Sequence, residues 1–148
     1  MDIHFTDSRE AAVPAQTLFA VIVDYPSYPQ FNPAVSAIEV VRQGDDGGEF
    51  VAVRRTAIGR TAHAYDAYRR GADLVVERTY AGMAGARSTW TVHPLDGDRC
   101  LLTIDALMPL GPIRGRLMKP LLKRIFYRLN FDPFIHEAER RAAARRAA

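Results

Sequence analysis

Apolar residues recur at every fourth position in the segment 112–129, PIRGRLMKPLLKRIFYRL. The recurring residues are Ile113, Leu117, Leu121, Ile125 and Leu129, and Met118, Leu122 and Phe126 lie beside them. In a helix these eight side chains cover more than half of the circumference, a wider face than the apolar stripe of an ordinary surface helix. Lys119 and Lys123 fall on the remaining arc. The pattern predicts a helix that buries a broad apolar face and keeps a cationic back.

Pro120 interrupts this helical pattern, because proline removes a helical hydrogen bond and disfavours helical geometry at the preceding Lys119. We therefore expect either a kink at this point or a short first turn followed by the main helix from Pro120. A single helix cannot cover its own apolar face, so strands elsewhere in the chain must cover it.

The N-terminal part of the chain predicts one strand and two short helical pieces. Residues 3–12 alternate between apolar and polar side chains, which is typical of a half-buried strand. Pro14 opens a helical segment, AQTLFAVIVD. The next string, DYPSYPQFNP, contains three prolines in ten residues and predicts a short helical turn within a loop.

From residue 35 on, short runs of strand-forming residues each end at a turn signal. The six predicted strands are VSAIEVVRQ at 35–43, EFVAVRRTAI at 49–58, RTAHAYDAYRR at 60–70, LVVERTY at 74–80, ARSTWTVHP at 86–94 and RCLLTIDALM at 99–108. The short turns between these strands predict an antiparallel meander, and with the strand at 3–12 the predicted sheet has seven strands. The predicted fold class is α+β, with a curved antiparallel sheet wrapped around a long C-terminal helix at 112–129 and two short helices after the first strand.

The C-terminal region is strongly basic. Residues 112–148 hold ten Arg or Lys and three acidic residues, whereas residues 1–111 hold ten and fourteen. Asp132 and Pro133 are a typical start of a helix, so 133–148 is predicted to be a basic helical extension of a single domain that spans 1–148. Such a region suggests contact with a lipid surface, RNA or an acidic partner, and a solvated helix face explains it as readily.

Several classes of protein are not expected. No apolar run approaches the ~20 residues of a membrane span, and the N-terminus has no signal-peptide pattern. Cys100 is the only cysteine, which excludes an intramolecular disulfide and a cysteine metal cluster and favours a cytoplasmic setting. There is no Gly-rich phosphate loop, no G-x-S-x-G and no H-E-x-x-H, and the four histidines lack metal-ligand spacing. We therefore expect no cofactor and no metal.

The order of elements, with VDYPSYPQFNPAVSAIEVV after the first helix and WTVHPLDGDRCLLTID near the end, resembles the START/polyketide cyclase-dehydrase/lipid-transport (SRPBCC) superfamily. This superfamily has the helix-grip fold, which the birch pollen allergen shares. The string D-x-x-x-Y-P-x-F-x-P at Asp24, Tyr28, Pro29, Phe31 and Pro33 looks like the polyketide-cyclase and ubiquinone-binding branches. The resemblance implies an apolar cavity between sheet and long helix that holds a lipid, quinone, sterol or polyketide-like molecule.

Strand parity selects the side chains expected to face the interior. Arg78 and Tyr80 share the side of Leu74 and Val76, so Arg78 points where apolar neighbours point. A buried guanidinium needs partners, because an unpaired buried charge is very costly. Arg78 therefore either pairs with a carboxylate, with Asp66 as the candidate, or faces a wet cavity and holds a carbonyl or enolate of a ligand.

The remaining site candidates come from the aromatic and apolar positions. Trp90 is either part of the core or part of a cavity wall. Tyr28 and Phe31 lie in the loop that would close one end of the cavity, where they cap the structure or, for the Tyr28 hydroxyl, make a polar contact. The candidate catalytic residues are Arg78, Tyr28 and His63, of which His63 ranks lowest because neither face of its strand is clearly the inner one. The predicted ligand-binding residues are Tyr28, Phe31, Arg78, Tyr80, Trp90, Leu102, Ile104, Leu121, Ile125 and Leu129.

Three functions remain in competition. The first is binding or transport of a hydrophobic small molecule, with the basic helix touching an anionic membrane surface. The second is a polyketide aromatase/cyclase or dehydratase, in which Arg78 stabilises an enolate and Tyr28 or His63 moves protons. The third is an interaction protein with a basic surface. Nucleic acid is not the expected partner, because the tail lacks interleaved aromatic residues that stack on bases.

Overall fold

The computed structural model describes residues 2–32, 35–43, 47–55, 61–70, 74–80, 86–109, 117, 120, 121, 124 and 130–147. Strands β3 (Gly47–Arg55) and β4 (Thr61–Arg70) are described by their backbone. Among all these residues, no helix combines the length and the hydropathy that crossing a bilayer requires.

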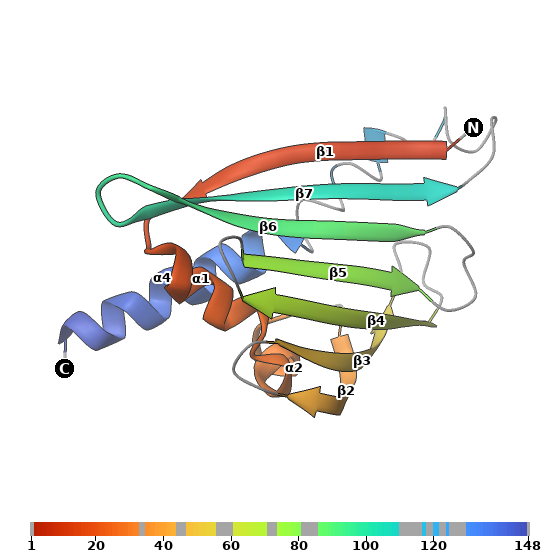
Figure 1. Ribbon diagram of the computed structural model, residues 1–148, viewed down its shortest axis with the longest axis horizontal. Coiled ribbons are helices and arrows are strands. Elements are labelled where there is room, and N and C mark those ends of the chain that lie inside the picture. Colours follow the sequence, from red (N-terminus) through yellow and green to blue (C-terminus); the bar gives the residue numbers. More distant parts are fainter. Residues whose placement is uncertain are drawn as a thin grey trace.

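The described strands form one antiparallel sheet with the order β1-β7-β6-β5-β4-β3-β2 (Figure 1). The other strands are β1 (Asp2–Ala11), β2 (Val35–Gln43), β5 (Leu74–Tyr80), β6 (Arg87–Leu95) and β7 (Arg99–Pro109). Strands β2 to β7 follow one another as a meander, as predicted. The first strand does not extend that meander next to β2; it pairs with the last strand, β7, at the opposite edge.

The turn between β6 and β7 shows why the turn residues predicted the strand limits well. Gly97 and Asp98 have φ values of 72° and 55°, both in the left-handed region. Glycine adopts this region without steric penalty, and aspartate tolerates it better than most residues. Two consecutive residues with positive φ are typical of the tight turns that join twisted antiparallel strands.

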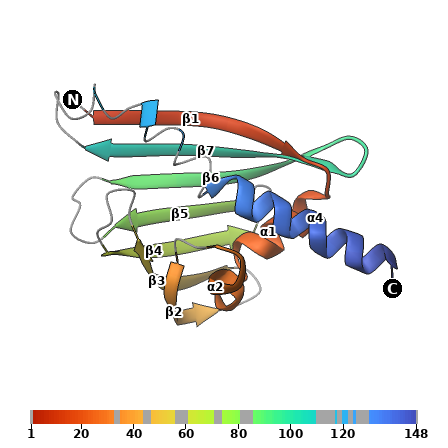
Figure 2. The ribbon, with the colours of Figure 1, turned by 180° about the vertical axis from the view of Figure 1, so that it is seen from behind.

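The described helices lie on one face of the sheet (Figure 2). They are α1 (Ala15–Ile22), the 3-10 helix η1 (Tyr25–Ser27), α2 (Tyr28–Phe31) and α4 (Asp132–Ala147). Helix α1 packs against β6 and β7 on one side and against α4 on the other, and α2 packs against β2 and α4. The architecture is therefore α+β, with an antiparallel sheet and a long C-terminal helix, as the sequence predicted.

The core lies between these helices and the sheet, and strand parity predicts it correctly. On β7, Cys100, Leu102 and Ile104 are fully buried. On β6, Ser88, Trp90 and Val92 share one side of the strand and are buried, while Arg87 and His93 on the other side are exposed. The helices complete the core with the side chains of Leu18, Phe19, Ile22, Phe131, Phe134, Ile135 and Ala138.

The helix predicted over 112–129 lies largely outside the described residues, as does the hollow expected between it and the sheet. Its described positions, 117, 120, 121 and 124, are helical. Leu117 and Leu121 are 77% and 55% exposed, so the prediction that both belong to a buried face is wrong. The physical reason is the width of the stripe, because a helix that packs on one sheet buries only part of its circumference.

The described part of the segment predicted at 133–148 is helical, as predicted, and belongs to α4 (Asp132–Ala147). The first half of α4 enters the core through Phe134, Ile135 and Ala138, which are at most 7% exposed. Together with Phe131 these residues follow the spacing i, i+3, i+4, i+7 of an amphipathic helix. This part of the C-terminal region packs on the domain itself.

Candidate functional site

Aromatic side chains from three separate parts of the chain converge where α4 crosses the sheet. Phe134 of α4 packs edge-to-face on Trp90 of β6, with ring centroids 5.1 Å apart and an interplanar angle of 89°. The same Phe134 ring contacts Tyr28 at 5.1 Å and Phe31 at 5.6 Å. Tyr25 stacks on Tyr28 at 4.8 Å. We call Tyr25, Tyr28, Phe31, Trp90 and Phe134 the aromatic cluster, and Phe134 lies at its centre.

Arg78 of β5 lies beside this cluster. Arg78 is only 1% exposed, and its guanidinium carbon lies 4.8 Å from the centroid of the Trp90 ring. This distance is within the range of a cation–π contact. The indole nitrogen of Trp90 donates a hydrogen bond to the Ser88 hydroxyl at 3.2 Å, and Ser88 is the cross-strand neighbour of Arg78. The prediction that Arg78 points into the apolar interior is confirmed.

The predicted ion pair of Arg78 with Asp66 stays a prediction. Asp66 is the cross-strand neighbour of Arg78 on β4, which is the position that such a pair requires. The Asp66 side chain lies outside the described residues. The register therefore places the two residues side by side in the sheet and leaves the choice between carboxylate pairing and ligand contact open.

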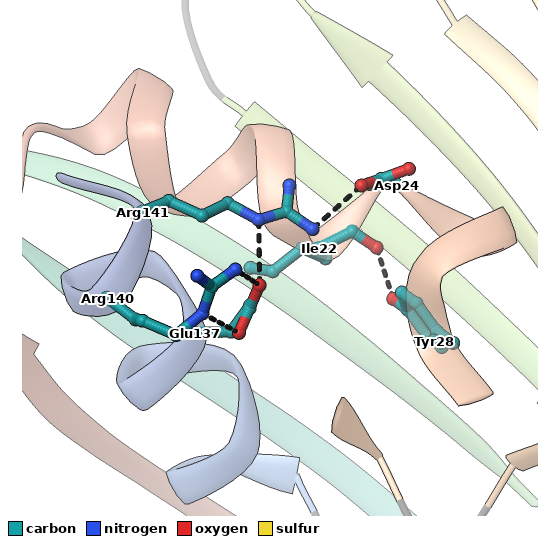
Figure 3. A network of polar contacts seen from close by, with 6 residues as sticks. All are labelled: Ile22, Asp24, Tyr28, Glu137, Arg140 and Arg141. Carbon is teal, nitrogen blue, oxygen red and sulfur yellow. Dashed lines mark hydrogen bonds and ion pairs between the residues drawn. The ribbon is translucent and has the colours of Figure 1, made fainter. Parts of the chain in front are cut away.

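Tyr28 uses its hydroxyl within the protein. The hydroxyl donates a hydrogen bond to the backbone carbonyl of Ile22, the last residue of α1, and Tyr28 is fully buried (Figure 3). Because helix ends leave carbonyl groups without helical partners, this bond caps α1. The Tyr28 proton is committed to this structural bond, and the predicted role of Tyr28 in closing one end of the cavity stays a prediction. Phe31 is half-buried and packs against the same core.

A network of charged groups joins α4 to the end of α1. Glu137 binds Arg140 at 2.7 and 2.9 Å and Arg141 at 3.0 Å, and Arg141 reaches Asp24 at 2.8 Å (Figure 3). The Glu137 side chain is only 11% exposed. The hydrogen bond from Arg140, followed by that from Arg141, lowers the pKa of the Glu137 carboxyl to about 2. Glu137 is therefore charged throughout the physiological range.

The other predicted site residues divide into three groups. Leu102 and Ile104 are fully buried on β7, on the face of the sheet that carries Trp90. His63 and Tyr80 lie on β4 and β5 by their backbone, and their side chains are outside the description, as are Ile125 and Leu129. Leu121 is described and is 55% exposed, so it is not enclosed in the core.

Sequence reasoning missed Phe134 and the partnership between Asp24 and Arg141. The signal for Phe134 was present, because the apolar spacing through Phe131, Ile135 and Ala138 marks an inward helix face. No comparable signal existed for the ion pair, whose members are 117 residues apart in the chain. Only the packing of α4 on α1 brings them together.

The described side chains provide neither a metal-binding group nor a reactive thiolate. They contain no group of three or more His, Cys, Asp or Glu residues that could hold a metal ion. The absence of a metal and of a cofactor stays a prediction. Burial raises the pKa of the Cys100 thiol to about 11, so this group is not a thiolate at neutral pH.

The fold is that of START-like proteins. A START superfamily protein from Mycobacterium smegmatis superposes with a TM-score of 0.72 at 19% identity, covering 93% of this chain and 97% of that chain. The Zhui aromatase/cyclase from Streptomyces sp. R1128 superposes with a TM-score of 0.70 at 18% identity, covering 96% of both chains. Human STARD10 gives 0.71 at 12% identity, with 97% of this chain and 66% of that chain covered.

The family follows from the sequence. The family model described as "Polyketide cyclase / dehydrase and lipid transport" matches residues 2–139, and the chain belongs to this family. No curated protein is similar enough in sequence to count as a match. Membership implies hydrophobic ligand binding or polyketide cyclisation as the class of function, in agreement with the resemblance seen in the sequence.

Proposed function

We propose that this protein binds and carries a hydrophobic small molecule, a lipid, quinone or polyketide-like compound, between the sheet and the segment 112–129. The observation that carries the proposal is Arg78, a charged residue that is 1% exposed and lies against an aromatic ring in a mostly apolar wall. Ligand sites commonly combine such apolar walls with a few polar groups that fix orientation. A guanidinium in this position suits the carbonyl of a quinone, an acyl chain or a ketone.

The described residues would line the proposed ligand site in different ways. Trp90 and Phe134 present ring edges and faces, which suit flat or chain-like apolar molecules. Leu102 and Ile104 supply aliphatic surface on β7. Phe31 borders the cluster from α2. Tyr80, Ile125 and Leu129 complete the proposed lining as predictions from the sequence alone, and Leu121 is left out because it is 55% exposed.

Trp90 supplies the assay, because it is the only tryptophan in the chain. The purified protein is titrated with decylubiquinone and with oleate while Trp90 emission is followed, and organic extracts of the protein are analysed by mass spectrometry. We expect saturable quenching and a copurifying hydrophobic compound. Emission that no member of a panel of quinones, fatty acids and sterols changes, together with an empty extract, would refute the proposal.

Variants of Arg78 test its contact with the ligand. Arg78→Met keeps an unbranched apolar stem of similar width and removes the charged guanidinium group. A hydrogen bond to a charged group is worth about 1.5–3 kcal/mol, so decylubiquinone should bind roughly tenfold to a hundredfold more weakly. A hydrocarbon of the same size should bind unchanged. The control is Arg99→Met, because Arg99 is half-exposed and pairs with Glu10 away from the cluster. Equal losses for both ligands would assign Arg78 to structure alone.

Catalysis on a polyketide chain is the second candidate, favoured by the same buried guanidinium, which would stabilise an enolate. Tyr28 is a weaker candidate for proton transfer than the sequence suggests, since its hydroxyl donates to the Ile22 carbonyl. His63 stays a candidate from the sequence alone. Under this hypothesis Arg78→Ala abolishes turnover of a poly-β-ketone while the fold is kept. Full turnover by the variant would eliminate it.

Contact of the basic C-terminal helix with an anionic membrane, in a cytoplasmic setting, is the remaining part of the proposal. Two of the arginines on α4, Arg140 and Arg141, are paired with Glu137 and Asp24, which weakens the positive potential that such contact needs. Retention on anionic vesicles that falls with rising salt would support it.

A further inference from the structure

Of the ion pairs that join the N-terminal part of the described chain to α4, which include Arg9–Asp132, the pair Asp24–Arg141 lies next to the aromatic cluster. A guanidinium nitrogen of Arg141 lies 2.8 Å from a carboxylate oxygen of Asp24, although 117 residues separate them in sequence. The two side chains are 24% and 33% exposed. A second nitrogen of Arg141 binds Glu137 at 3.0 Å, so the guanidinium is held from both sides (Figure 3).

Both members of this pair are directly connected to the aromatic cluster. Asp24 immediately precedes Tyr25, and Tyr28 is tied back to Ile22 by its hydroxyl, so the segment 24–31 is a short and well-anchored unit. On α4, Arg141 follows Phe134 by seven residues, or about two helical turns, and therefore lies on the same face. The ion pair thus joins the two segments whose rings meet at Phe134.

We infer that Asp24 and Arg141 are positioning residues for the aromatic wall of the proposed ligand site. They hold α4 against the segment 24–31 so that Phe134 sits between Trp90, Tyr28 and Phe31. This inference rests on the proposed function, and it assigns a role to the aspartate of the D-x-x-x-Y-P-x-F-x-P string. A bound molecule that contacts Trp90 meets a wall whose shape depends on the position of Phe134.

Arg140 offers a matched control within the same network. Like Arg141 it binds Glu137, but it makes no hydrogen bond to Asp24, and its side chain is 66% exposed. A loss of charge on α4, or a weakening of the Glu137 contacts, would affect Arg140→Gln and Arg141→Gln alike. A loss of the connection to the aromatic segment would affect only Arg141→Gln and Asp24→Asn.

The experiment uses the full chain with four variants: Asp24→Asn, Arg141→Gln, the double variant and Arg140→Gln. The near-ultraviolet circular dichroism of Trp90 in the ligand-free protein reports the contact with Phe134, and quenching by decylubiquinone reports affinity. We expect a changed Trp90 signal and about threefold to tenfold weaker binding for both single variants, no further loss in the double variant, and native behaviour for Arg140→Gln. Partly exposed ion pairs contribute little to global stability, so the urea midpoints should stay close together.

The possible outcomes separate the two proposals. If the native protein binds neither decylubiquinone nor other hydrophobic probes, the proposed function fails, while the Trp90 signals still decide whether the pair positions Phe134. Unchanged Trp90 signals and affinities in both single variants would overturn the positioning role. Additive losses in the double variant, or equal losses in Arg140→Gln, would likewise overturn it, because the effect would then not depend on the Asp24–Arg141 contact. Restoration of affinity by Asp24→Glu would support it further.

Discussion

Truncation of Phe134 to alanine is the most direct test of how α4 is built into the protein. Phe134 is fully buried and contacts the rings of Trp90, Tyr28 and Phe31 at centroid distances of 5.1, 5.1 and 5.6 Å. Removing a buried phenylalanine costs about 3–5 kcal/mol, and the aromatic contacts place the expected loss toward the upper end. Phe134→Leu refills part of the space and should cost about 1–2 kcal/mol, chiefly through the lost ring contacts.

The assay is urea unfolding followed by Trp90 fluorescence, with the free energy of unfolding taken from the midpoint and slope. With a slope of about 2 kcal/mol per molar urea, Phe134→Ala should lower the midpoint by roughly 2 M. The control is His136→Ala on the exposed side of the same helix, which should change stability by no more than about 0.5 kcal/mol. A Phe134→Ala variant that loses less than about 1 kcal/mol would show that α4 does not pack on Trp90 in solution, and the aromatic cluster would have to be abandoned.

Two further predictions concern ionisable groups. The pKa of Glu137 is about 2, below its ordinary value of 4.5, so its stabilising effect is complete above pH 4.5 and disappears as the pH falls toward 2. Glu137→Gln should therefore lower the free energy of unfolding by about 1–2 kcal/mol at pH 7, after allowance for solvent screening of Arg140, and should leave it unchanged near pH 2. Curves of stability against pH that run parallel for the two proteins would contradict this prediction. Because burial raises the pKa of Cys100 to about 11, a disulfide reagent at pH 8 should leave the native thiol unmodified and react only after unfolding. Rapid modification of the native protein would show that the inner face of β7 is open at this residue.

The sequence predicts the sheet well because each of its signals is local. Alternation with a period of two residues, and turns rich in glycine and aspartate, depend only on neighbours in the chain. The predicted limits of the strands at 35–43 and 74–80 coincide with those of β2 and β5. Parity along β5 likewise gave the buried side of Arg78.

The C-terminal region was harder to predict for two physical reasons. The apolar stripe of 112–129 is so wide that periodicity alone cannot say which part is buried, and Leu117 and Leu121 belong to the exposed part. In α4, the apolar stripe is confined to the first half of the helix, and the arginine-rich second half makes the sequence of the whole helix look like that of a solvent-exposed one. The partners of Arg141 and Phe134 lie on α1, α2 and β6, and such long-range choices depend on packing rather than on local pattern.

The pairing of the first strand with the last also governs how the protein is made. During synthesis β1 leaves the ribosome before β7, which begins at Arg99 and is its neighbour among the described strands. At about 5–20 residues per second, β1 waits on the order of ten seconds for that partner to leave the ribosome. Until β7 emerges, β1 therefore remains an unpaired, half-apolar strand of the nascent chain. Chaperone capture at Phe5 and neighbouring residues, and a folding step that requires the emergence of β7, are the expected consequences of this topology.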